Sequence, residues 1–149
     1  MGRLSLIFLI LISLSACNGS RQSNYYKSSI DVTTAENLIP LSEGEKPEII
    51  FSKNIDADKE KYQGLGYVIL GESEFENREK YRAIRRTRDS NVARAVGQAM
   101  NVSATHVLYL RKKVGEYSTT SYKSDGGYDT KHYEKYLNRA VYMVRGRAN

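Results

Sequence analysis

Residues 105–117 read Thr-His-Val-Leu-Tyr-Leu-Arg-Lys-Lys-Val-Gly-Glu-Tyr, and this stretch decides the fold. Its side chains alternate, because Val107, Tyr109 and Arg111 face one way in an extended chain and the residues between them face the other. Both sets are apolar near the middle of the stretch, as His106, Leu108 and Leu110 show for the second set. A segment that is apolar on both faces indicates a strand in the interior of a sheet.

A second alternating stretch, residues 139–145, predicts a strand that closes the sheet, with Val141 and Met143 on the face opposite to Tyr142. Residues 118–137 lie between the two strands and are rich in Ser, Thr, Tyr, Lys, Gly and Asp. Asp125-Gly126-Gly127 is a strong turn signal. We therefore expect either a long hairpin whose arms extend beyond the core or a mobile loop.

Two short apolar runs upstream are also expected to be strands. Glu48 to Ser52 follows Pro47 and is short and partly β-branched, and residues 64–71 form an apolar run with glycine at both ends. The charged residues 54–63 between the runs predict a loop or a helical turn.

Residues 77–100 form the one convincing helix, because apolar side chains recur there at spacings of three, four and seven or eight. Arg88 occupies a position where another apolar residue would continue the stripe, so a break near Asp89 and Ser90 is an alternative, with Ser90 capping a second piece. Asn101 is expected to end the helix. The stripe consists of Tyr81, Ile84, Val92, Ala95, Val96 and Ala99.

These elements predict an α+β fold: a small sheet of about four strands in the order strand, strand, helix, strand, strand. One main helix packs on one face, and a long Tyr-rich hairpin or loop joins the last two strands. We expect residues 48–149 to form a single domain, which fits a chain of 149 residues. Residues 30–47 are expected to be irregular.

The N-terminal residues look like an export signal. Met1 to Arg3 carries one positive charge, and Leu4 to Leu14 is an apolar run of about eleven residues, which fits a signal peptide and is too short to span a bilayer. Leu14-Ser15-Ala16-Cys17 follows and resembles the lipobox of bacterial lipoproteins. The resemblance implies a signal peptide over residues 1–16 and acylation of Cys17, which is the one cysteine of the chain.

A lipoprotein of this kind would be held to a membrane by two or three acyl chains, since a single chain binds only marginally. The polar residues 17–29 would form a flexible tether. Asn18 follows the cysteine, and by resemblance to enteric lipoproteins a residue other than Asp permits transfer to the outer membrane. We expect lipid anchorage at the periplasmic face of the outer membrane, with the inner membrane and the cell surface as alternatives.

The folded part also resembles small bacterial envelope proteins of uncharacterised function. Residues 66–75 match a Gly-Tyr-Val-x-x-Gly-x-Ser-x-Phe pattern, and an Ala-rich helix end at residues 95–104 follows. A Tyr, Ser and Thr-rich segment at residues 117–122 and a closing strand at residues 140–144 complete the arrangement. The resemblance implies a shared fold, and it supplies no activity and no catalytic residues. Ser103 stands where the pattern usually has Gly.

No pattern in the sequence indicates catalysis, a cofactor or a metal. His106 and His132 do not stand in a ligand-spaced cluster, and the acidic residues around Asp56 and Asp125 lack the Glu that closes a calcium-binding loop. No Gly-x-Ser-x-Gly elbow or phosphate-binding glycine loop is present. We therefore expect a protein that is not an enzyme, with an envelope hydrolase as a remote alternative.

Two features suggest a partner surface. A basic cluster covers residues 78–88, and it is either a solvated helix face or a docking surface for an anionic envelope component. A Tyr-rich segment interleaved with lysines follows at residues 117–136, where tyrosines suit either recognition or strand formation. The candidate partner residues are Arg78, Arg82, Arg85, Arg86, Tyr117, Tyr122, Tyr128 and Tyr133.

These features lead to two expected functions. The first is a non-catalytic binding or structural component of an envelope assembly, such as a secretion-system outer-membrane complex. The second is a lipoprotein that binds or senses cell wall or a small ligand. Envelope proteins, peptidoglycan and anionic lipid are the expected partners, and nucleic acid is not.

Overall fold

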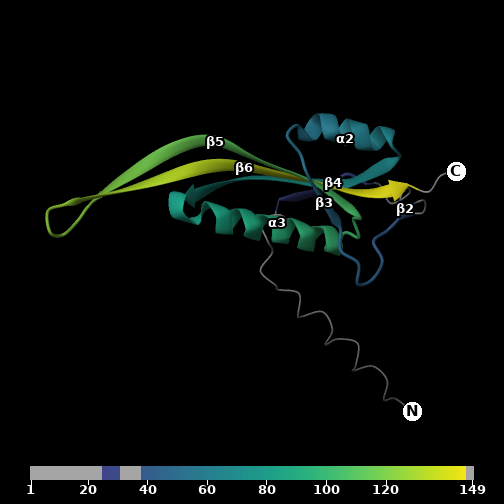
Figure 1. Ribbon diagram of the computed structural model, residues 1–149, viewed down its shortest axis with the longest axis horizontal. Coiled ribbons are helices and arrows are strands. Elements are labelled where there is room, and N and C mark those ends of the chain that lie inside the picture. Colours follow the sequence, from purple (N-terminus) through teal and green to yellow (C-terminus); the bar gives the residue numbers. More distant parts are fainter. Residues whose placement is uncertain (1–24, 31–37, 147–149) are drawn as a thin grey trace, which may run out of the picture.

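The computed structural model describes residues 25–30 and 38–146 as one mixed, mostly antiparallel sheet with a helix on each face (Figure 1). The strands follow the order β1-β4-β6-β5-β3, and β2 pairs with the end of β6. This confirms the α+β class. The predicted count of about four strands and one main helix is wrong, because the described residues contain six strands and two helices. The strands are β1 (Tyr26–Ser28), β2 (Leu38–Ile39), β3 (Glu48–Phe51), β4 (Tyr67–Lys80), β5 (His106–Tyr122) and β6 (Tyr128–Gly146), and the helices are α2 (Ile55–Gly64) and α3 (Ile84–Asn101).

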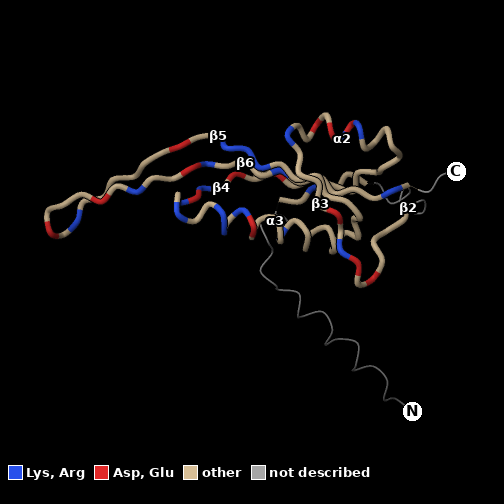
Figure 2. Tube along the Cα trace, viewed as in Figure 1, with Lys and Arg blue, Asp and Glu red and all other residues tan. Residues whose placement is uncertain are grey.

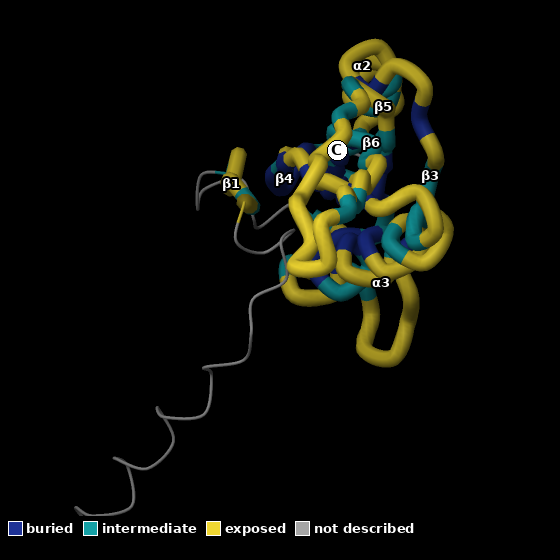
Figure 3. The backbone as a smooth tube through the Cα atoms, turned by 90° about the vertical axis from the view of Figure 1, so that its left-hand side faces the viewer, coloured by how far each residue is buried: buried dark blue, intermediate teal, exposed yellow. Residues whose placement is uncertain are grey.

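The strand predicted at residues 105–117 is β5, and it lies in the interior of the sheet where β3 and β6 flank it. Its alternation is confirmed. Val107 and Tyr109 join a core under α3, together with Ala95 and Ala99 of that helix. Leu108 joins a second core on the opposite face, under α2. Figure 3 shows buried residues between α3 and the sheet.

Helix α2 occupies the segment predicted as a loop or a helical turn. Asn54 caps its N-terminus by accepting a hydrogen bond from the Ala57 amide at 3.3 Å, and Asp56 and Asp58 complement the helix dipole in the first turn. Ile55 is its only buried residue. A helix with so little apolar surface gives almost no periodic signal, which explains why the pattern did not distinguish it from a loop.

Arg139 of β6 attaches α2 to the sheet. Its guanidinium donates to both carboxylate oxygens of Asp56 at 3.0 Å each, and it lies 2.8 Å from a Glu74 oxygen on β4. The hydrogen bonds from Arg139 hold the pKa of the Asp56 carboxyl below its usual value. This polar attachment compensates for the small apolar face of α2.

The predicted helix start at Asn77 is wrong, because β4 continues to Lys80 and α3 begins at Ile84 after a 3₁₀ turn, Tyr81–Ala83. Ser73, Phe75, Asn77 and Glu79 are all buried with a period of two. Three of these four residues are polar, so the sequence shows no alternation of apolar residues that would indicate a strand here. The alternative break near Asp89 and Ser90 is absent, since α3 is continuous to Asn101, where the predicted end is confirmed.

The prediction that residues 17–29 form a flexible tether is wrong for residues 26–28. Residues 26–28 form β1, which pairs with Ser73, Glu72 and Gly71 of β4. The Tyr26 hydroxyl also donates to the Leu70 carbonyl at 2.9 Å, and its ring meets Tyr142 edge-on. The sheet therefore starts before the predicted domain boundary at residue 48. The segment predicted to be irregular, residues 30–47, contributes the short strand β2.

Candidate functional site

The hairpin of β5 and β6 extends beyond the rest of the sheet, which confirms the extended-hairpin prediction rather than the mobile loop (Figure 1). Pairing of β6 with β4 ends at Tyr133 and Lys80, whereas pairing with β5 continues to Tyr122 and Tyr128. The turn closes with a hydrogen bond from the Lys123 amide to the Gly127 carbonyl at 2.7 Å, and Gly126 adopts a φ of 85°. Residues 116–133 thus form a two-stranded ribbon, which we call the projecting ribbon.

Two aromatic pairs lie along the projecting ribbon. The rings of Tyr117 and Tyr133 stack at its base, with centroids 5.1 Å apart and an interplanar angle of 10°. Arg78 lies over the Tyr117 ring at 4.9 Å from its centroid. At the tip, Tyr122 and Tyr128 meet edge-on at 5.2 Å and are 68% and 72% exposed. The structure therefore brings Arg78, Tyr117 and Tyr133 together and holds the other two tyrosines as a separate pair.

The basic cluster spans three elements instead of one helix. Arg78 and Lys80 lie at the end of β4, Arg82 lies in the 3₁₀ turn, and Arg85 and Arg86 lie in the first turn of α3. All five are exposed. Figure 2 shows these cations gathered at one end of α3, near the base of the ribbon. We call this set the basic end of the molecule.

A buried polar network lies beneath the start of α3. Glu79 is 2% exposed and accepts a hydrogen bond from Arg111 Nη2 at 2.6 Å, and the guanidinium of Arg111 lies 3.4 Å from the centroid of the Tyr136 ring. Asn138 connects the network to the core, because it accepts from the Tyr109 hydroxyl at 2.9 Å and donates to Asn77 at 2.8 Å. A buried ion pair needs such supporting hydrogen bonds to offset the loss of hydration.

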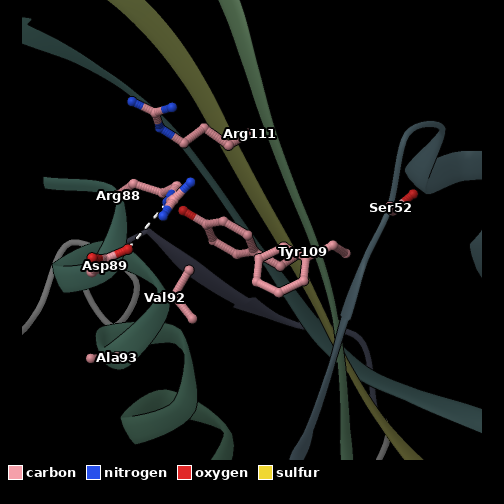
Figure 4. Close-up of a pocket in the computed structure, with 8 residues that line it drawn as sticks. Ser52, Arg88, Asp89, Val92, Ala93, Tyr109 and Arg111 are labelled. Atoms are coloured by element: carbon pink, nitrogen blue, oxygen red, sulfur yellow. Dashed lines mark hydrogen bonds and ion pairs between the residues drawn. The ribbon is translucent and has the colours of Figure 1, made fainter. Parts of the chain in front are cut away.

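A cleft of about 690 Å³ opens beside this network, between α3 on one side and β3 and β5 on the other (Figure 4). Tyr109 forms its floor, and burial raises the pKa of this tyrosine to about 12. The ring of Phe51 stands edge-on to Tyr109 at 6.1 Å and is 68% exposed. The full lining is Phe51, Ser52, Arg88, Asp89, Val92, Ala93, Tyr109 and Arg111.

The two histidines lie apart, and each has a partner. His106 is half-buried between Tyr67, at 3.3 Å, and a Glu48 carboxylate oxygen, at 3.4 Å, and His132 is exposed on the ribbon, 2.7 Å from Ser118 Oγ. Across residues 25–30 and 38–146, no three His, Cys, Asp or Glu side chains are placed to hold one metal ion.

No protein-family model, curated protein or solved structure matches this chain. In the part of the chain that the structure describes, no helix is long and apolar enough to cross a bilayer. The predicted signal peptide and the predicted lipidation site, with Leu14, Ser15, Ala16 and Cys17, lie outside the described residues.

Sequence reasoning missed the cleft. The sequence pattern places Arg88 in the basic cluster, yet this residue lines the cleft, and the same pattern predicts only ordinary strand residues at Phe51, Tyr109 and Arg111. Phe51 and Tyr109 are directly paired across β3 and β5, which run parallel. The sequence contains no local signal for such a pairing, because the two positions are 58 residues apart (109 minus 51). The one available signal was the charge of Arg111 on the face predicted to be buried.

Proposed function

We propose that this protein is a bacterial lipoprotein, anchored through acylated Cys17 at the periplasmic face of the outer membrane, that acts as a non-catalytic binding or structural component of an envelope assembly. The observation that supports this most directly is the projecting ribbon, residues 116–133. It reaches beyond the core (Figure 1), and its tip exposes the Tyr122–Tyr128 pair to the surroundings.

The ribbon has the properties of a contact element. From Tyr133 toward the turn, the outer edges of the two ribbon strands pair with no other strand among residues 25–30 and 38–146. Both edges therefore offer backbone donors and acceptors to a partner. Its tyrosines offer large, stiff surfaces for recognition at low entropy cost. A two-stranded ribbon adds little stability in isolation, which argues for a role in binding rather than in holding the fold together.

The place where β1 joins the sheet supports an orientation on the membrane. Strand β1 runs antiparallel to β4, and Tyr25 before it stacks on Phe75 at 6.0 Å. The N-terminal end of β1 is therefore the end nearer to Lys80 of β4. Cys17 precedes Tyr25 by about eight residues, which span at most about 28 Å. The anchor would keep the basic end near the lipid headgroups.

Affinity purification of the tagged, lipidated protein from gently solubilised membranes tests the proposal. We expect a stable set of envelope proteins to co-purify and to be identified by mass spectrometry. A trimmed variant, in which Asn-Gly replaces residues 119–131, should lose these partners. Its circular dichroism spectrum should still resemble that of the unmodified protein, which shows that the variant is folded. Recovery of the lone protein, or equal recovery of partners with the trimmed variant, would count against the proposal.

A second candidate function, binding of cell wall or a small ligand, is favoured by the cleft beside Tyr109 and by the exposed tyrosines at the ribbon tip. Saturable binding of the protein to isolated peptidoglycan, lost when Tyr122 and Tyr128 are both replaced by Ala, would support the cell-wall form of this candidate. Binding that survives this double replacement would exclude the ribbon tip as the glycan contact.

A further inference from the structure

The cleft beside the buried network has the size of a small-molecule site. Its volume of about 690 Å³ falls within the range of roughly 300–1,000 Å³ that is usual for ligand pockets. Phe51 and Val92 provide apolar surface on its two walls, and Tyr109 provides an aromatic floor. Phe51 is 68% exposed, although an aromatic ring of this size is normally packed against other groups.

Two guanidinium groups line the cleft from opposite walls, Arg88 from α3 and Arg111 from β5 (Figure 4). Arg111 uses Nη2 for Glu79, and its Nε is buried without a hydrogen-bond partner among the described residues. Arg88 pairs with Asp89 at 3.1 Å, but both side chains are more than half exposed, so this pair is weak and easily opened. Arg88 can therefore take a further anionic partner, and Arg111 keeps one donor, Nε, that no group among the described residues uses.

Donors outnumber free acceptors in the cleft. The Tyr109 hydroxyl is already committed to Asn138 and the Ser52 hydroxyl to Asp58, at 2.9 Å and 2.6 Å. The Asp89 carboxylate is the one anionic group that lines the cleft. A cationic ligand would meet Arg88 and Arg111, and an uncharged apolar ligand would leave Arg88 with Asp89 as its one acceptor and Arg111 Nε with none among the described residues.

We propose that the cleft binds a small organic anion, a carboxylate or sulfonate carried on a flat aromatic body. The anionic group lies between Arg88 and Arg111, and the aromatic body lies between Phe51 and Val92 over Tyr109. Guanidinium groups bind oxyanions with charge-assisted hydrogen bonds, so the two arginines select ligands that carry an anionic group. This inference is independent of the projecting ribbon, which lies outside the cleft.

A fluorescence titration tests the proposal on the full mature chain, with Cys17→Ser so that no lipid is attached. The probe is 8-anilinonaphthalene-1-sulfonate, an aromatic sulfonate that fluoresces when it leaves water. We expect saturable binding with one site per chain and displacement by 3-phenylpropionate. The amine 3-phenylpropylamine has the same aromatic body and the opposite charge, and it should not displace the probe.

Variants assign the binding to the cleft. Arg88→Ala and Phe51→Ala should each weaken probe affinity by about fivefold or more, and Asp89→Asn should tighten it by about twofold or more because it frees Arg88. Arg94→Ala is the matched control, since Arg94 is exposed on the flank of α3 that faces away from Arg88 and Asp89, and its removal should leave affinity unchanged. A circular dichroism spectrum of the parent type confirms that each variant is folded.

Three results would overturn the proposal. The first is the absence of saturable binding of either anion up to millimolar concentration. The second is equal weakening by Arg94→Ala and Arg88→Ala, which would indicate general attraction to a basic surface. The third is displacement of the probe by the amine as readily as by the carboxylate, which would indicate that the apolar surface alone binds.

Discussion

At the scale of single residues, the most unusual feature is a carboxylate buried under the start of α3. Glu79 has a side chain that is 0% exposed, and its charge is balanced by Arg111, which is 13% exposed. Asn77 supports the same carboxylate with a hydrogen bond at 2.9 Å. Removal of one member of a buried pair leaves the other charge without compensation, and this costs more than the pair itself contributes.

We predict that Glu79→Gln lowers the free energy of unfolding by about 3 kcal/mol, because Arg111 then keeps an unbalanced charge. Urea unfolding followed by circular dichroism measures this loss. Glu116→Gln is the control, since Glu116 forms an exposed ion pair with Lys113 and its replacement should change stability little. The double variant Glu79→Leu with Arg111→Met should lose less than Glu79→Gln alone. A Glu79→Gln protein as stable as the parent would contradict the assignment of Glu79 as the balancing charge.

Tyr109 gives a prediction about alkaline pH. Burial raises its pKa in the folded chain to about 12, whereas an unfolded tyrosine titrates near 10. The folded state therefore holds this proton more tightly, so the stabilisation is complete below about pH 10 and is lost as pH rises toward 12. A difference of this size between the folded and unfolded pKa corresponds to about 2.7 kcal/mol.

The test compares the parent with Tyr109→Phe, which has no hydroxyl to ionise. Urea unfolding at about pH 9 and pH 11.5 should show a steeper loss of stability in the parent, by up to about 2 kcal/mol. Burial raises the pKa of Tyr142 to about 12 as well, and Tyr142 remains in both proteins, so the difference isolates Tyr109. Equal losses in the two proteins would show that Tyr109 ionises at an ordinary pH in the fold.

At the scale of elements, the periodicity of apolar residues located the strands that are buried through apolar side chains. It missed the strand segments that are held in place by polar side chains. The alternation at residues 105–117 and 139–145 located β5 and β6 and assigned their faces correctly. The end of β4 was mistaken for helix because Asn77 and Glu79 are buried through hydrogen bonds, not through apolar surface. Strand β1 is polar and short, so nothing in residues 26–28 distinguished it from a tether.

Alanine at two glycines, one inside α3 and one inside β4, should change stability in opposite directions. Gly97 lies inside α3, and a Cβ there would meet no atom within 4 Å outside its own helix backbone. Gly97→Ala should therefore raise the free energy of unfolding by about 0.5–1 kcal/mol, because alanine loses less backbone entropy on folding. A Cβ at Gly71 would lie 2.5 Å from the Lys27 carbonyl oxygen and from the Tyr26 ring, so Gly71→Ala should displace β1 from β4.

Thermal unfolding separates these variants, and hydrogen exchange locates the change. Gly97→Ala should unfold at a higher temperature than the parent. Gly71→Ala should unfold at a lower one and expose the amides of residues 26–29 to rapid exchange. If Gly71→Ala left those amides protected, the close approach of β1 to β4 at this position would be wrong.

At the scale of the whole molecule, β5 and β6 run from a core covered on both faces to a ribbon that projects from it (Figure 1). Val141 and Tyr142 are 1% and 0% exposed, whereas Tyr128 on the same strand is 72% exposed. The cluster at residues 78–88 and the Tyr-rich segment were both predicted as partner surfaces. What one sequence could not give is their placement side by side, since it depends on where β4 ends against β6.

The rate of amide hydrogen exchange should rise along β5 and β6 from the buried core to the exposed ribbon. Amides of residues 136–144 lie between β4 and β5 and should be strongly protected, whereas those of residues 116–132 should exchange far faster, because the ribbon has free edges and little cover. The change should fall near the irregular pairing at residues 113–115 of β5. Uniform protection at low protein concentration would mean that the ribbon is already covered by a second chain.

The basic end gives a prediction about orientation on a membrane. Arg82, Arg85 and Arg86 are exposed, and no ion pair engages them among the described residues. Each cation near an anionic surface adds about 1 kcal/mol of attraction at moderate ionic strength. The non-lipidated mature chain should bind vesicles of phosphatidylcholine containing a quarter of phosphatidylglycerol, and it should bind pure phosphatidylcholine vesicles much less.

Replacing these three arginines together by glutamate should weaken that binding by more than about tenfold, as judged by vesicle co-sedimentation. The matched control replaces Lys46, Lys53 and Lys61 by glutamate, which changes the net charge equally at exposed positions in the loop before β3, just before α2 and within α2. If binding depends only on net charge, both triple variants will weaken it alike, and the basic end has no special role. If only the arginine variant loses binding, the membrane contacts the basic end of the molecule, and the projecting ribbon stays free to contact a partner.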